Sequence, residues 1–205
     1  VTNNNFQNIN QILKQELKIS ARLQHKLIEN KHVYLNDKII DTRSSVQKND
    51  VITVNLDFDE ENENIIATNM HLIIVYEDDC FLILNKPAGI AVHPSMQHYT
   101  DSLANGIKFY FDSIGFHKKI RPINRLDLNT SGLVIFAKNE YVQECLIKQM
   151  QEKTFEKYYI AFVEGSFSDS NGTINLPIAR KENSIIERCI SPSGQNAITD
   201  YKVLA

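Results

Sequence analysis

The sequence predicts an α+β protein, in which a small front domain of two helices and a short sheet (αα-β) precedes a mostly antiparallel mixed-sheet domain. Three observations support this fold class. Apolar residues recur at helical spacing in only four short stretches. The other apolar runs are short and bounded by Asp, Asn, Gly or Pro, as antiparallel strands and their turns usually are. An acidic stretch separates the two parts, and 205 residues with a hydrophobic share of 42% suffice for two packed cores.

The first 56 residues predict two helices followed by a small antiparallel sheet. Ser20 is placed to cap the second helix, because its hydroxyl can accept a hydrogen bond from the first turn. The helical stripes are Ile9, Ile12, Leu13 and Leu17, then Leu23, Leu27 and Ile28. Strand-like runs follow at 33–35, 38–40 and 51–54, with turns at 36–37 and 49–50.

Residues 57–68 are interpreted as an acidic linker. The stretch 57–64 holds five acids, no base and one apolar residue, without periodicity. The predicted domains are therefore 1–56, the linker, and 69–205.

The second domain alternates strand-like runs with two helices. Helical spacing marks Leu103, Ile107 and Phe111, and a second helix from residue 142 that Asn139 could cap. The expected strands are 72–76, 81–84, 133–137, 154–163, 185–190 and 197–204.

Bulk properties exclude several classes of protein. No apolar run approaches the roughly 20 residues of a membrane helix, and the amino terminus has no signal-peptide pattern, so we expect a cytoplasmic protein without a membrane partner. Three separated cysteines and six histidines lack metal-ligand spacing, which favours a protein without metal or cofactor. The net charge of −3 argues against nucleic acid as a partner, but residues 1–48 carry eight Lys or Arg against four acids. The front domain is locally basic.

The segment 121–133 is the strongest candidate for a site. Arg125 and Asp127 stand two residues apart, so an extended backbone would point both to one side. A carboxylate held before a strand suits nucleophilic attack or proton abstraction. The alternative is a structural ion pair between the two side chains. We further expect Asp127 to lie in a pocket.

This segment resembles the arginine-leucine-aspartate-x-x-threonine-serine-glycine signature of the RluA-type pseudouridine synthases, which convert uridine in RNA to its carbon-linked isomer. Four further stretches resemble family motifs in the family's order. They are 85–94 (Asn-Lys-Pro-Ala-Gly-Ile-Ala-Val-His-Pro), 157–165 (Lys-Tyr-Tyr-Ile-Ala-Phe-Val-Glu-Gly), 172–180 and 197–201. Similarly, residues 21–36 and 50–52 resemble an S4 RNA-binding domain, so the front domain is expected to be S4-like.

The resemblance implies roles for five residues. Asp127 would act at the ribose, as a nucleophile or as a base, and Arg125 would hold it or fill the space left by the flipped uridine. Tyr159 would stack on the base, Lys157 would support the site or a phosphate, and His93 would line the entrance. The alternative, purely structural interpretations are that Tyr159 belongs to the core and that Lys157 is a solvated surface residue. Asn124 replaces the family's usual histidine, which puts fine positioning in doubt.

The partner implied is RNA, with large-subunit ribosomal RNA preferred over transfer RNA, and a monomer is expected. A non-catalytic RNA-binding protein is the competing hypothesis, whereas glycoside hydrolysis would need a second carboxylate. Family members continue past residue 205 into a basic segment, so we expect the chain to be a C-terminally truncated piece. Without those strands apolar sheet surface would be uncovered, and the activity of the piece alone is in question.

Overall fold

The computed structural model describes residues 8–40, 44–184 and 187–205. Contacts divide the chain into two compact units, Val1–Glu156 and Lys157–Ala205, and each is described by itself. Within the described residues no helix is long and apolar enough to cross a membrane.

The first unit begins with two helices packed on a three-stranded sheet. The helices are α1 (Ile9–Gln15) and α2 (Ala21–Glu29), and the strands β1 (Val33–Leu35), β2 (Lys38–Ile39) and β3 (Ile52–Val54) lie in the antiparallel order β2-β1-β3. The Ser20 side chain accepts a hydrogen bond from the Leu23 backbone N–H, so the predicted cap is confirmed. The core between the helices and the sheet contains Ile9, Leu13, Ile19, Leu23, Leu27 and Val33.

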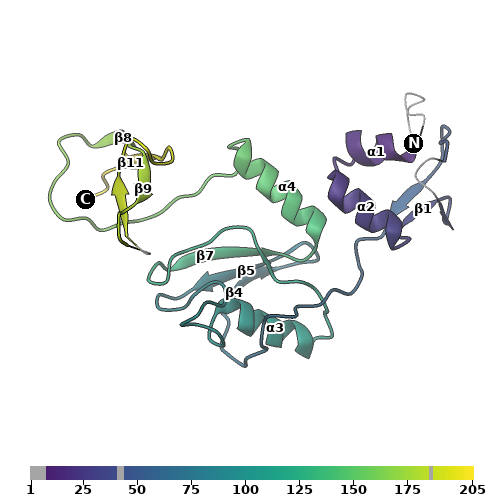
Figure 1. Ribbon diagram of the computed structural model, residues 1–205, viewed down its shortest axis with the longest axis horizontal. Coiled ribbons are helices and arrows are strands. Elements are labelled where there is room, and N and C mark those ends of the chain that lie inside the picture. Colours follow the sequence, from purple (N-terminus) through teal and green to yellow (C-terminus); the bar gives the residue numbers. More distant parts are fainter. Residues whose placement is uncertain (1–7, 41–43, 185–186) are drawn as a thin grey trace. The chain divides into compact units, whose positions relative to one another are not determined.

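The rest of the first unit is built around a four-stranded antiparallel sheet, in which the strands lie in the order β4-β5-β7-β6. Its strands are β4 (Ile74–Glu77), β5 (Phe81–Lys86), β6 (Arg121–Pro122) and β7 (Gly132–Ala137). Helices α3 (Leu103–Ser113) and α4 (Glu140–Gln151) lie on opposite sides of this sheet (Figure 1). The larger core lies under α3, where Leu103, Ile107 and Phe111 meet the inward side chains of β5 and β7. Both predicted helices and the Asn139 cap are confirmed.

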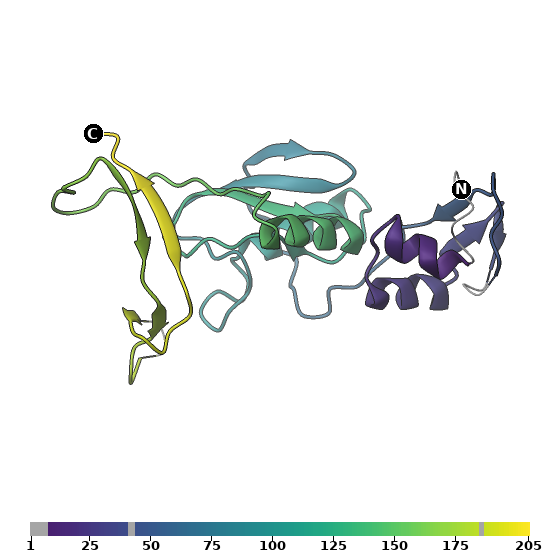
Figure 2. The same cartoon turned by 90° about the horizontal axis from the view of Figure 1, so that it is seen from above.

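The described residues of the second unit form two strand pairs. Strands β8 (Asn171–Asn175) and β11 (Ile198–Lys202) run side by side as one antiparallel ribbon (Figure 2), and β9 (Ile178–Arg180) pairs with β10 (Arg188–Ile190). Part of the strand expected at 185–190 lies outside the described residues.

The strand expected at 154–163 is wrong. The chain from Glu156 to Val163 forms no strand, and Tyr158, Ile160 and Phe162 are 86, 81 and 100% exposed. Alternating aromatic and β-branched residues fit a strand only where neighbouring strands and a core receive them. The described sheets are built from other segments, so the local sequence pattern of 154–163 was not sufficient to predict a strand.

Candidate active site

Asp127 lies in the loop that connects β6 to β7. The loop begins at Asn124, whose side chain bonds the backbone of β7 twice. Its amide donates to the carbonyl of Leu133 (2.9 Å), and its Oδ1 accepts from the N–H of Ile135 (3.0 Å). Asn124 thus extends the short pairing of β6 with β7 and anchors the start of the loop.

The loop is fastened a second time beyond Asp127. The carbonyl of Asp127 accepts from the N–H of Thr130 (3.1 Å), which closes a tight turn. The carbonyl of Leu128 accepts from the N–H of Gly89 (2.8 Å) and from the Nζ of Lys86 (2.9 Å). The two motif segments 85–94 and 121–133 are therefore hydrogen-bonded to each other next to the candidate carboxylate, although the bonded residues Lys86 and Leu128 lie 42 positions apart in the sequence.

Lys86 lies within the motif 85–94, but no role was predicted for it from the sequence. Its side chain is fully buried, and its Nζ also donates to the carbonyls of Pro87 (3.0 Å) and Ile90 (2.8 Å). Burial lowers the pKa of Lys86, and the negative charge of Asp127 opposes this effect. The signal was present in the sequence: Lys86 continues the inward alternation of Leu82 and Leu84 on β5, where a charged side chain must find buried partners.

Replacing Lys86 by Met should destabilise the protein by about 2 kcal/mol, because three carbonyl groups lose the donor that they share. Lys148→Met is the matched control, since Lys148 is half-exposed and its ion pair with Glu152 spans 3.6 Å. The control should change stability by less than about 0.5 kcal/mol. Urea unfolding of both variants measures the difference, and equal midpoints would contradict the role assigned to Lys86.

The remaining candidates of the first unit are on the surface or close to it. Arg125 and Asp127 are exposed while Leu126 between them is half-buried, an alternation that matches the expected common side. Among the described residues no ion pair joins Arg125 to Asp127, which weighs against the structural-pair alternative. His93 is half-buried, and its pKa is lowered first by burial and then by the positive charge of Arg125. His93 is therefore neutral at neutral pH.

Lys157 and Tyr159 belong to the second unit. Both are exposed, and Tyr159 is 59% exposed on the segment that forms no strand. Their roles beside Asp127 stay predictions.

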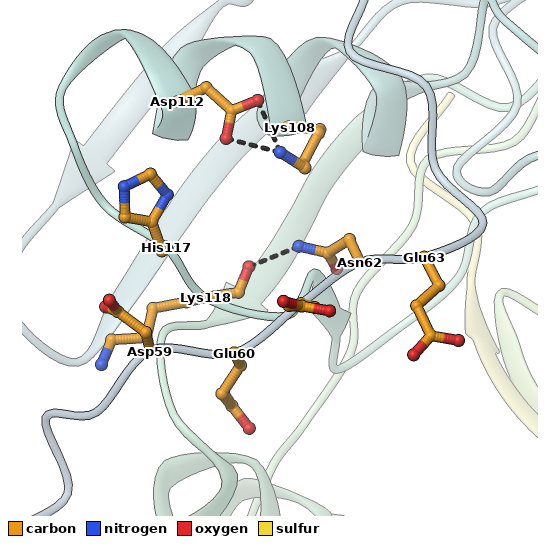
Figure 3. Close-up of a pocket in the computed structure, with 9 residues that line it drawn as sticks. Asp59, Glu60, Asn62, Glu63, Lys108, Asp112, His117 and Lys118 are labelled. Atoms are coloured by element: carbon orange, nitrogen blue, oxygen red, sulfur yellow. Dashed lines mark hydrogen bonds and ion pairs between the residues drawn. The ribbon is translucent and has the colours of Figure 1, made fainter.

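Two cavities among the described residues lie elsewhere in the first unit. One of about 490 Å³ is bounded by the acidic stretch 59–63 and by Lys108, Asp112, His117 and Lys118 (Figure 3). The other, of about 440 Å³, lies between residues 69–74 and α3. Asp127 lines neither of them, so the expected pocket is not one of these two cavities. Among the described residues, no group of three or more His, Cys, Asp or Glu side chains is arranged to hold a metal.

The structure is thus that of an α+β protein. Asp127 lies in a loop of its antiparallel sheet, and this loop is hydrogen-bonded to the motif segment 85–94. Two family models match the chain in the same order as its domains. RNA pseudouridylate synthase matches residues 80–205, and RluD ribosomal pseudouridine synthase N-terminal domain matches residues 2–52. The chain belongs to the RNA pseudouridylate synthase family, with an S4-like N-terminal domain of the RluD type.

Curated relatives agree with this assignment. The chain is 36% identical over 194 residues to the uncharacterized RNA pseudouridine synthase YhcT of Bacillus subtilis, covering 95% of this chain and 64% of the relative. It is 32% identical over 183 residues to ribosomal large subunit pseudouridine synthase D of Vibrio cholerae, covering 89% and 56%. The chain thus spans between about half and two thirds of the length of these relatives.

A solved structure supports the fold alone. Human RNA pseudouridylate synthase domain containing 1 superposes with a TM-score of 0.50 at 24% identity, covering 63% of this chain and 51% of that one.

Proposed function

We propose that the protein containing this chain isomerises uridine to pseudouridine in large-subunit ribosomal RNA, with Asp127 as the catalytic carboxylate. The observation that carries the proposal is the loop of Asp127, which has the family's signature and is hydrogen-bonded to the family's first motif through Leu128. Membership of the family supports the reaction class. The curated relatives named ribosomal large subunit pseudouridine synthase D support the choice of RNA.

The chemistry requires few protein groups. The bond between the ribose and N1 of uracil breaks, the base rotates, and C5 bonds to the same ribose carbon. One proton leaves C5 and N1 gains one, so the product has the composition of the substrate and no co-reactant is needed. In this proposal Asp127 attacks the ribose carbon or removes a ribose proton, and its exposed carboxylate is accessible for either step.

The other residues would bind the RNA rather than react. Arg125 is exposed, two residues before Asp127, and can occupy the place of a uridine that has left its helix. His93, being neutral, offers a hydrogen-bonding edge at the entrance without adding charge. Tyr159 would stack on the extruded base, and Lys157 would contact a phosphate.

Incubation of the full-length protein with transcripts of large-subunit ribosomal RNA and, separately, of transfer RNAs tests the proposal. Pseudouridine is measured by mass spectrometry of nuclease digests, and we expect it in the ribosomal transcript. Pseudouridine in transfer RNA alone would overturn the choice of substrate. Binding of both RNAs without any pseudouridine would overturn the reaction and favour a non-catalytic RNA-binding protein.

A further inference from the structure

Five charged side chains connect the S4-like domain to the sheet domain within the first unit. We call them the ion-pair joint: Arg22, Lys26, Glu60, Arg121 and Glu140. Lys26 of α2 lies at its centre, with its Nζ 2.8 Å from Glu60 and 3.0 Å from Glu140. Arg121 of β6 holds Glu60 through two hydrogen bonds of 2.6 and 2.7 Å, and Arg22 of α2 contacts Glu140 at 2.7 Å. Glu60 thus binds one cation from each domain, and Glu140 of the sheet domain binds two cations of the S4-like domain.

Three of the five side chains of the joint are withdrawn from water, whereas Arg22 is exposed. The side chains of Glu60, Arg121 and Glu140 are 6, 7 and 9% exposed, and Lys26 is 32% exposed. Burial alone lowers the pKa of Lys26, but its bonds to Glu60 and Glu140 outweigh burial, so the pKa is raised and the ammonium stays charged. Buried pairs of this kind are screened by salt much less than surface pairs.

Further hydrogen bonds support the same attachment. Ser20, the cap of α2, bonds Glu144 of α4 through its hydroxyl (2.5 Å) and its N–H (3.3 Å). The hydroxyl of Tyr141 donates to the carbonyl of Leu17 (2.9 Å). The N-terminal half of α4 therefore holds the start of α2 and the residue Leu17 before it, in addition to the ion pairs.

The acidic stretch that supplies Glu60 is itself fastened. The ring of Phe58 stacks on His32 with centroids 4.6 Å apart, and the Asn62 side chain donates to the carbonyl of Lys118 (2.7 Å), as Figure 3 shows. In the same view Glu60 points away from Lys108 and Asp112. The stretch has no regular secondary structure, as expected of a linker. It nevertheless contacts both the S4-like domain and the sheet domain, so it is not a freely moving connection.

We propose that the ion-pair joint determines specificity by holding the S4-like domain at a fixed orientation to the sheet that carries Asp127. This proposal deepens the proposed function and rests on it. Two RNA-binding surfaces in fixed geometry reinforce each other only on an RNA that presents both binding elements at one spacing. The substrate class is then a folded RNA with a docking helix at a set distance from the target uridine, and a short unstructured RNA gains nothing from the joint.

Electron–electron double resonance on the full-length protein tests the orientation without any RNA. One spin label goes on the native, exposed Cys80 and one on Gln15→Cys, an exposed position of α1, after Cys145 and Cys189 are replaced by Ser. We expect one narrow distance distribution. A broad distribution in this background would overturn the proposal.

The joint is opened by Arg22→Met with Lys26→Met, which cuts the bonds from α2 and leaves the pair of Glu60 and Arg121 in place. Lys14→Met with Lys38→Met is the matched control, because it also removes two positive charges from exposed or partly exposed positions of the same domain. The first pair should broaden the distance distribution and the control should not. A narrow distribution in the opened variant would overturn the proposal.

The same variants are compared on RNA. The opened variant should lose about tenfold in kcat/KM relative to the control on the folded ribosomal transcript, and nothing on a short single-stranded RNA that contains the target uridine. Equal losses on both RNAs would overturn the specificity role. If the wild-type protein modifies neither RNA, the proposed function fails, while the distance measurement still decides whether the joint fixes the domain.

Discussion

Replacing Asp127 by Asn is expected to abolish pseudouridine formation, lowering the rate by at least about 10³-fold. The amide has nearly the shape of the carboxylate but is neither a nucleophile towards the ribose carbon nor a base. The Asp127 side chain is exposed and no ion pair or side-chain hydrogen bond holds it among the described residues, so the variant should fold with a stability change within about 0.5 kcal/mol. The loop stays in place because it is fastened through the backbone of Leu128 and the side chain of Asn124.

The measurement is pseudouridine formed per enzyme in the ribosomal transcript, together with affinity for that RNA. Affinity should be preserved, because losing one exposed acid removes no favourable phosphate contact. Asp79→Asn, at another exposed acid in a turn between strands, is the control and should keep full activity. An Asp127→Asn variant that modifies RNA at the normal rate would show that another group performs the reaction.

Local rules explain most of the helices and turns that were predicted from the sequence. Ser20 and Asn139 cap their helices because a short polar side chain reaches the N–H three residues on. The turn of Asn36 and Asp37 has two positive φ angles, 49° and 64°, which these residue types tolerate better than most. Each of these features depends on neighbours in the chain, and a single sequence contains that information.

The features that were missed depend on partners far away in sequence. The acidic composition around Glu60 predicts a solvated linker. Nothing in the neighbouring sequence indicates that the Glu60 side chain is buried against Arg121 and Lys26. The segment around Tyr159 has the composition of a strand, but pairing requires another segment at the right place. For the candidate site, the motif located Asp127, whereas the bonds of Lys86 and Asn124 that fix its loop appear only in three dimensions.

The variant Glu60→Gln should lose roughly 3–5 kcal/mol of stability at neutral pH. The substitution removes the carboxylate that binds the buried guanidinium of Arg121, and it takes away one of the two counter-charges of Lys26. Typical domains have a total stability of about 5–15 kcal/mol, so the loss is a large fraction of what holds the first unit together. Asp112→Asn breaks an ion pair with Lys108 along one face of α3 and is the control, expected to cost less than about 1 kcal/mol. Urea unfolding at pH 7 compares them, and equal losses would mean that burial of Glu60 contributes little.

In the variant Glu60→Gln the free energy of unfolding should also depend less on pH in the acidic range. Burial by itself would raise the pKa of Glu60, but hydrogen bonds and charges from Arg121 and Lys26 outweigh it and hold the pKa at about 2, against an ordinary 4.5. Since the folded pKa lies below the unfolded one, the stabilisation is complete above pH 4.5 and is lost as the pH falls towards 2. This interval corresponds to roughly 3 kcal/mol. Unfolding free energies measured between pH 5 and pH 2 should therefore fall more steeply for the wild type than for Glu60→Gln, and parallel curves would contradict the assignment of a charged, buried Glu60.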